Sequence, residues 1–226
     1  MRFAAVETAT DWCSVALWVD GEIAALERRA EHRHSELALP MLDRLLKEAG
    51  MTAAQLDAVA FGAGPGAFTG LRIACGLAQG LAFARGLPVL GVSTLEALAQ
   101  EAGATRVVAC LDARMREVYY AALEMDGDRA GAGWREVVPV QCVAPRLAPA
   151  PPGEGWIGCG NGFAAYPELL GDCISMVKSE IHPTAVAVAE LAAPRLSRGE
   201  GVDAALAAPI YVRDKVALTQ AELERR

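Results

Sequence analysis

The sequence predicts a mixed α/β fold in which helices cover a β-sheet. Asp20-Gly21 lies between two apolar runs, and this dipeptide favours the tight turn of a β-hairpin. Beyond residue 34, segments with helical spacing of apolar residues alternate with short apolar runs, as expected for strands with covering helices. A second strand-rich start at Arg106 repeats the opening of the chain. We therefore expect a duplicated βββαβα unit whose second copy is eroded, with a first lobe at 1–104 and a second at 105–226.

The first lobe opens with three expected strands in residues 2–30, followed by a helix over 34–50. We expect Ser35 to cap this helix, Pro40 to bend it and Gly50 to end it. Its buried face is expected to carry Leu37, Met41, Leu45 and Ala49.

The remaining elements follow from the same signals. Ser93 or Thr94, with Glu96 in the first turn, resembles a capping box and predicts a helix start. A proline-rich surface loop is expected at 144–155, and a helix from His182 onward that buries Val186, Ala189, Leu191 and Ala193. The tail over 207–226 reads as a short extended piece and a charged end. Further strands are expected at 58–64, 87–92, 106–114, 117–125 and 134–144.

The composition limits the possible functions. The chain has 226 residues, of which 53% are hydrophobic and 22% charged, so it can build a large core. Its net charge of −7 argues against binding nucleic acid unaided, because phosphate contacts need a basic surface. The six cysteines have no CxxC spacing, and several lie in apolar runs, which suits a reducing cytoplasm. We expect no leader segment and no membrane span.

Residues 62–70, GAGPGAFTG, resemble a glycine-rich phosphate loop. The segment lacks the GK[ST] ending of a Walker A loop and the GxGxxG pattern, so it supplies no lysine to phosphates. A phosphate site remains an alternative, because Thr69 or Gly70 opens a helix whose free N–H groups attract anions.

The helix expected over 71–84 has almost no polar face. Ile73, Leu77, Leu81 and Ala84 can face the sheet, and the opposite side then carries Ala74, Gly76, Ala78 and Gly80. Glycine within a helix costs about 1 kcal/mol relative to alanine, so two of them need a packing reason. Two readings stay open: burial inside this chain, or close contact with a helix of another subunit.

Other candidate chemistry is weaker. His32 and His34 have i,i+2 spacing, which splays the two rings on a helix, and His182 stands alone, so we expect no metal site. The cysteines have no neighbouring base, so we expect no cysteine nucleophile. Asp112 and Arg114 follow a strand, where ligands often bind, but an ion pair that fixes the turn is favoured.

Several motifs together resemble a known family, TsaB (also called YeaZ). The segment GPGAFTGLRIACGLAQGLA resembles the family signature GPGSFTGLRIG. The likeness continues, in order, through VETAT…SVAL, HSELALPMLDRLL, GVSTLEALA, DARMREVYYA, GNG followed by Tyr166, HPTAVAVAELA and PIYVRDKVALT. Residues 125–156 match least.

This resemblance implies a fold and a role. The fold is the two-lobed ASKHA fold shared by acetate kinase, sugar kinases, Hsp70 and actin. The role is that of a non-catalytic paralogue of the transferase TsaD in the synthesis of N6-threonylcarbamoyladenosine (t6A) in tRNA. The family forms a heterodimer with TsaD, recruits the ATPase TsaE and forms homodimers when alone. ATP and metal would then belong to the partners, with no intrinsic cofactor, and tRNA would be met only through the complex.

In the family, the helices that follow HSE and GPG(S/A)FTG form the dimer contact. Carried onto this chain, the expected interface residues are His34, Ser35, Leu39, Leu42, Gly64, Pro65, Gly66, Phe68, Thr69, Gly70, Leu71, Arg72, Cys75, Gly76, Gln79 and Gly80.

Two departures from the family pattern concern chemistry. Glu7-Thr8-Ala9 stands where the family usually has DTS, and Ala67 replaces the serine of the signature. An aspartate at the first position supports the metal–phosphate site in kinases of this fold, so the longer glutamate weakens a catalytic reading. A vestigial nucleotide cleft could still involve Glu7, Thr8, Asp112 and Arg114. An autonomous phosphotransferase and a metallopeptidase-like protein are the alternative functions.

Overall fold

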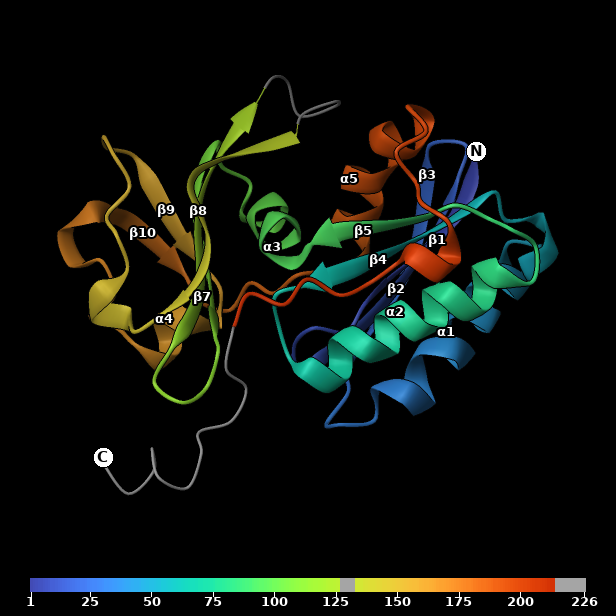
Figure 1. Cartoon of the computed structure of the whole chain (residues 1–226), viewed down its shortest axis with the longest axis horizontal. Helices are drawn as coiled ribbons and strands as arrows, with labels where there is room; N and C mark the ends of the chain where they lie inside the picture. Colours follow the sequence, from blue (N-terminus) through green and yellow to red (C-terminus); the bar gives the residue numbers. More distant parts are fainter. Residues whose placement is uncertain (127–132, 214–226) are drawn as a thin grey trace.

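The chain forms two lobes, each built on a five-stranded sheet, with a C-terminal segment that runs from one lobe to the other (Figure 1). The structure is a computed structural model and describes residues 1–126 and 133–213. Within those ranges, no helix is long and apolar enough to cross a membrane.

The first sheet has the strand order β3-β2-β1-β4-β5. Its first three strands form an antiparallel meander, and β4 and β5 add to it in parallel. Asp20 and Gly21 have positive φ angles of 49° and 105°, which confirms the expected hairpin turn. The strands are β1 (Arg2–Glu7), β2 (Trp12–Val19), β3 (Glu22–Arg29), β4 (Ala58–Gly64) and β5 (Val89–Ser93).

The second sheet repeats this topology. Its order is β10-β9-β6-β7-β8, again an antiparallel meander of three strands with two parallel additions. The strands are β6 (Arg106–Asp112), β7 (Val118–Asp126), β8 (Gly133–Val143), β9 (Trp156–Cys159) and β10 (Ile174–Lys178). The predicted duplication is confirmed, although β9 and β10 were not anticipated from the sequence.

The second copy is eroded, as expected, on its helical side. Between β8 and β9, where the first copy has a long helix, the described chain has the loop at 144–155 with one short turn of 3₁₀ helix. The helix between β9 and β10, α4 (Asn161–Ala165), is only 5 residues long. The 3₁₀ turns are η1 (Ala53–Gln55), η2 (Pro145–Leu147), η3 (Gly171–Cys173) and η4 (Ala204–Leu206).

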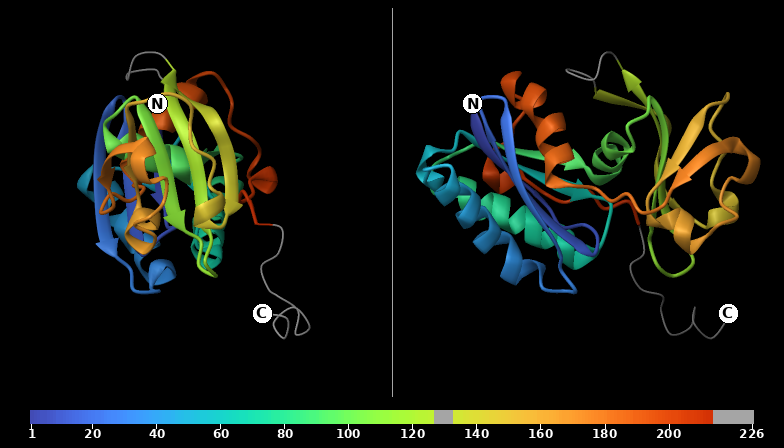
Figure 2. Two further views of the ribbon diagram at one scale, coloured as in Figure 1. Left: turned by 90° about the vertical axis from the view of Figure 1, so that its left-hand side faces the viewer. Right: turned by 180° about the vertical axis from the view of Figure 1, so that it is seen from behind.

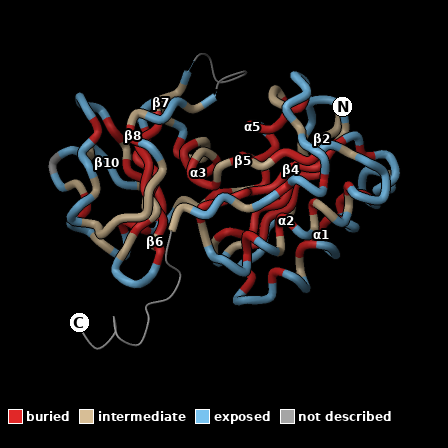
Figure 3. Tube along the Cα trace, in the orientation of Figure 1, coloured by how far each residue is buried: buried red, intermediate tan, exposed pale blue. Residues whose placement is uncertain are grey.

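The first sheet is covered on both faces. Helices α1 (His34–Glu48) and α2 (Phe68–Phe83) pack on one face, where alternate residues such as Val6, Val59 and Phe61 point. Helix α5 (Ala185–Ser197) packs on the other face, over the intervening residues such as Phe3 and Ala60. The central strands are therefore buried on both sides (Figure 3).

Two helices are exchanged between the lobes. Helix α3 (Thr94–Ala102) follows β5 of the first sheet but packs its Leu95 and Leu98 into the core of the second. Helix α5 follows β10 of the second sheet but covers the first. Helix α5 lies beyond the boundary expected at residue 105, yet it packs on the sheet of the first lobe (Figure 2).

Both helices begin where the sequence predicts, but only the predicted cap of α3 is confirmed. Ser93 is the N-cap residue of α3, and its hydroxyl accepts a hydrogen bond from the Glu96 amide at 3.4 Å. Helix α1 instead begins at His34 after Arg33, without a side-chain cap, so Ser35 does not cap it.

Helix faces were predicted less well than helix positions. In α2 the small residues Ala74, Ala78 and Ala82 face the sheet, whereas Ile73, Leu77 and Leu81 are only half-buried. The short side chains let the helix approach β4 closely, which a leucine stripe would prevent. Ala49 and Ala84 are exposed and Val186 is half-buried, contrary to expectation, whereas Ala189, Leu191 and Ala193 are buried as expected.

Leu191 of α5 can test whether this helix supports the first sheet, because its side chain is buried against that sheet. Leu191→Ala should lower the free energy of unfolding by about 2–4 kcal/mol, because the deletion leaves a cavity. Hydrogen exchange should then speed up in β1 and β4 rather than only in the second lobe. The control Leu206→Ala removes a side chain that is 73% exposed and should change stability by less than about 0.5 kcal/mol. An effect of Leu191→Ala confined to β6–β10 would contradict this assignment.

Candidate functional site

The glycine-rich loop lies directly against the end of β1. A Cβ atom at Gly70 would sit 1.9 Å from the Thr8 carbonyl oxygen, and one at Gly66 would sit 2.6 Å from the Ala9 Cβ. The Thr8 hydroxyl donates to the Gly70 carbonyl at 2.8 Å, and the Ala67 amide donates to the Ala9 carbonyl at 2.8 Å. These glycines are explained by the close approach of two backbones.

Glu7 ends β1 inside the protein. Its carboxylate accepts hydrogen bonds from the Ala9 amide at 2.6 Å and from the Thr94 hydroxyl at 3.4 Å. Gly62 makes room for it, since a Cβ there would lie 1.8 Å from the Glu7 Oε2. Burial raises the pKa of this carboxyl to about 7, against the opposing effect of its hydrogen bonds.

A cleft of about 260 Å³ separates the lobes near the start of α2. Asp112 and Arg114 line it, and they pair with each other at 3.2 Å, which confirms the expected ion pair. Glu7 and Thr8 do not line it, because both are buried behind the loop. The structure therefore brings together only half of the residues expected for a nucleotide cleft.

The three histidines have different surroundings. His34 is the first residue of α1 and is buried, and its Nε2 is 2.8 Å from the Thr10 carbonyl oxygen. His182 stacks on Trp12 and lies 3.0 Å from Glu27, whereas His32 is exposed. In the described parts of the chain, no three His, Cys, Asp or Glu side chains gather in a way that could hold a metal.

The expected interface residues divide by burial. Seven are buried and have little surface to offer a partner: His34, Leu42, Gly64, Pro65, Gly70, Leu71 and Cys75. Leu42 and Cys75 pack into the core beneath the two helices and have almost no exposed surface in the single chain. The nine with exposed or partly exposed surface are Ser35, Leu39, Gly66, Phe68, Thr69, Arg72, Gly76, Gln79 and Gly80.

The outer face of α2 has few polar side chains, among them those of Arg72 and Gln79. Ideal Cβ atoms at Gly76 and Gly80 would meet no heavy atom of the described residues within 4 Å. These two glycines therefore do not serve packing within the described chain. Phe68 and Phe83, at the two ends of the helix, are 43% and 74% exposed, and Leu39 on the adjacent α1 is 52% exposed. We call this face, with its two glycines and three large side chains, the α1/α2 face.

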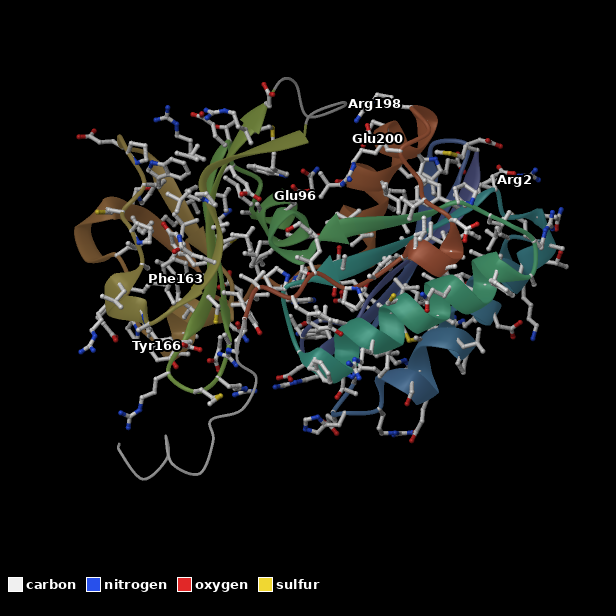
Figure 4. All side chains as sticks on the ribbon, viewed as in Figure 1. Arg2, Glu96, Phe163, Tyr166, Arg198 and Glu200 are labelled. Atoms are coloured by element: carbon white, nitrogen blue, oxygen red, sulfur yellow. The ribbon has the colours of Figure 1, made fainter. Side chains whose placement is uncertain are left out.

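Some surface residues of this region carried no expected role. Phe83 is strongly exposed, and Tyr211 lies 5.7 Å from the Phe68 ring and 3.2 Å from Arg72. The only available signal was the motif PIYVRDKVALT, of which residues 209–213 are described. Phe163 and Tyr166, by contrast, belong to the second lobe and lie far from the α1/α2 face (Figure 4).

Comparison with known proteins gives consistent matches. A family model described as TsaD, tRNA N6-adenosine threonylcarbamoyltransferase, matches residues 27–145. The chain is 39% identical over 225 residues to the tRNA threonylcarbamoyladenosine biosynthesis protein TsaB of Escherichia coli (strain K12), with 96% of each chain covered. It is 38% identical over 230 residues to the Haemophilus influenzae protein of the same name, with coverage of 96% and 95%. The solved structure of YeaZ from Pseudomonas aeruginosa superposes with a TM-score of 0.87 at 39% identity, covering 93% of this chain and 99% of that one.

Two lobes of one repeated topology around a cleft place the chain in the ASKHA class of α/β proteins. Within that class it belongs to the TsaB (YeaZ) family, as the near-full-length identity to curated TsaB proteins shows.

Alanine substitutions at Gly70 and Gly76 of α2 should change the free energy of unfolding in opposite directions. Gly70→Ala should lower the free energy of unfolding by about 3 kcal/mol or more, because the new methyl group overlaps the Thr8 backbone. Gly76→Ala should raise it by up to about 1 kcal/mol, because alanine favours the helix and meets open space. Urea unfolding of both variants measures the difference. Equal effects would contradict the steric account.

The buried carboxyl should make stability depend on pH. The Glu7 pKa is about 7 in the folded chain against an ordinary value of 4.5, so the folded state holds the proton more tightly. The resulting stabilisation is present below pH 4.5 and is lost as the pH rises through 7. Between pH 5.5 and 8, the free energy of unfolding of the wild type should fall by about 2 kcal/mol relative to that of Glu7→Gln. Parallel stability curves for the two proteins would refute an elevated pKa at this position.

Proposed function

We propose that this protein acts in tRNA N6-threonylcarbamoyladenosine biosynthesis as a non-catalytic subunit that docks a TsaD-like transferase on its α1/α2 face. The observation that carries the proposal is the open, apolar surface around Gly76 and Gly80 on a helix whose inner side is fully packed. A helix with so few polar side chains normally lies inside a protein, so its exposed side favours a covering partner. The names of its TsaB relatives supply the pathway.

The internal chemistry supports a role without catalysis. Glu7, which stands where kinases of this fold have an aspartate, is separated from the cleft by the glycine-rich loop. Asp112 and Arg114 neutralise each other. Catalysis, ATP and metal are on this proposal functions of the partner proteins, and a TsaE-like ATPase is recruited to the assembled pair.

The charge and the thiols support the setting. A net charge of −7 gives the lone chain little attraction for a phosphate backbone, so tRNA is bound through the complex. The described structure has six free cysteines, four of them buried, as suits a reducing cytoplasm. In the absence of a TsaD-like partner, the α1/α2 face pairs two copies of the chain.

The proposal predicts that a bulky side chain at Gly76 on the α1/α2 face weakens partner binding. Gly76→Leu should leave the fold intact, because its Cβ meets open space, but should weaken binding of a purified TsaD-like protein. A lost central contact costs about 2 kcal/mol, or roughly thirtyfold in affinity. Isothermal titration measures the affinity, and circular dichroism checks the fold.

The matched control is Glu190→Leu, which places the same side chain at an exposed position of α5, on the opposite face of the first sheet. It should bind like wild type. If Gly76→Leu is folded and binds as tightly as the control, the α1/α2 face is not the docking surface.

A further inference from the structure

The C-terminal segment over 207–213 crosses from the first lobe to the second and forms one side of the interlobe cleft (Figure 1). We call it the strap. Its start is fixed on α2, where the Ala207 carbonyl accepts hydrogen bonds from Gln79 at 3.0 Å and from Cys75 at 3.5 Å. Further along, the Ile210 amide donates to the Ala63 carbonyl at 2.7 Å, at the end of β4.

The middle of the strap is held by the exposed end of α2. The Tyr211 ring lies 5.7 Å from the Phe68 ring, and its hydroxyl is 3.2 Å from the Arg72 Nε. The Arg72 guanidinium in turn lies 4.0 Å from the Phe68 ring centre, a cation–π contact. Arg72, Phe68 and Tyr211 thus form one cluster on the protein surface.

The far end of the strap enters the second lobe through Arg213. Its Nη2 donates to the Ala113 carbonyl at 2.9 Å and to the Glu117 carboxylate at 2.6 Å. Its guanidinium also lies 5.8 Å from the Tyr119 ring centre. The side chain is only 14% exposed, so these charge-assisted bonds are shielded from water.

The β6–β7 turn, to which Arg213 binds, has a strained backbone. Arg114, Met115 and Arg116 all have left-handed backbone conformations, with φ angles of 61°, 54° and 62°. Such residues cost roughly 1–2 kcal/mol each when they are not glycine. The turn between β6 and β7 therefore needs outside support, and Arg213 provides it by binding carbonyl groups within the turn.

We propose that the strap is an interlobe latch, in which Arg213 holds the strained β6–β7 turn and the Arg72–Phe68–Tyr211 cluster holds the strap. Whatever covers Arg72 at the exposed end of α2 then acts on the second lobe, although Arg72 belongs to the first. This coupling is a property of the single chain. Only the identity of the covering partner depends on the proposed function.

Hydrogen exchange of the lone, full-length protein tests the latch. The reporters are the amides of Ala113 and Glu117, which hydrogen-bond within the turn to the carbonyls of Glu117 and Arg114. Arg213→Ala should speed their exchange about tenfold or more, through the loss of hydrogen bonds from a charged donor. Arg213→Lys, which keeps the charge but cannot reach several acceptors with one planar group, should show an intermediate effect.

The decisive variant is Arg72→Ala. It should speed exchange at the same two amides by about threefold, although it changes an exposed side chain of the other lobe. Its matched control is Arg44→Ala, which breaks an exposed ion pair with Glu48 on α1 and should leave the turn unchanged. If Arg72→Ala behaves like Arg44→Ala, the turn is supported only locally and the latch is refuted. If Arg213→Ala does not fold, the Arg72→Ala and Arg44→Ala comparison still decides, and it is independent of any partner binding.

Discussion

The close approach of the loop over residues 62–70 to the end of β1 determines the arrangement of everything around it. Gly66 and Gly70 let two backbones come together at distances that no side chain would allow. This contact fixes where α2 begins, and it encloses the Glu7 carboxylate between Ala9 and Thr94. The segment that resembles a phosphate loop thus packs against the end of β1. As a result, Glu7 of the first strand is buried and does not line the cleft.

The same helix carries glycines with two different purposes. Gly70 is required by what lies beneath it, whereas Gly76 and Gly80 face open space in the described chain. Helical glycine is costly, so glycines that no internal packing explains favour a function on the outer face. The open space above Gly76 and Gly80 therefore supports the docking role proposed for the outer face of α2.

The two lobes depend on each other for their cores. α3 leaves the first sheet to fill the second, α5 leaves the second to cover the first, and the Gln100 side chain of α3 donates to Glu190 of α5 at 2.8 Å. The strap adds a third connection, made by side chains. A change at the exposed end of α2 can consequently reach the second lobe without passing through either core, because Tyr211 and Arg213 lie two residues apart on one short segment.

The sequence by itself determined the strand and helix order of the first lobe, the Asp20-Gly21 hairpin, the Ser93 cap and the repeat beginning at Arg106, since each depends on local backbone chemistry or on spacing along the chain. Tertiary structure alone decided that Ala74 and Ala78 face the sheet, because a helix with so few polar residues has little periodicity to orient it. It also decided that Leu42 and Cys75 are buried. The placement of α5 on the first sheet and of Arg213 in the β6–β7 turn depends on contacts between segments about 100 residues or more apart. No local pattern encodes such contacts, and only the packing of two complete lobes brings these residues together.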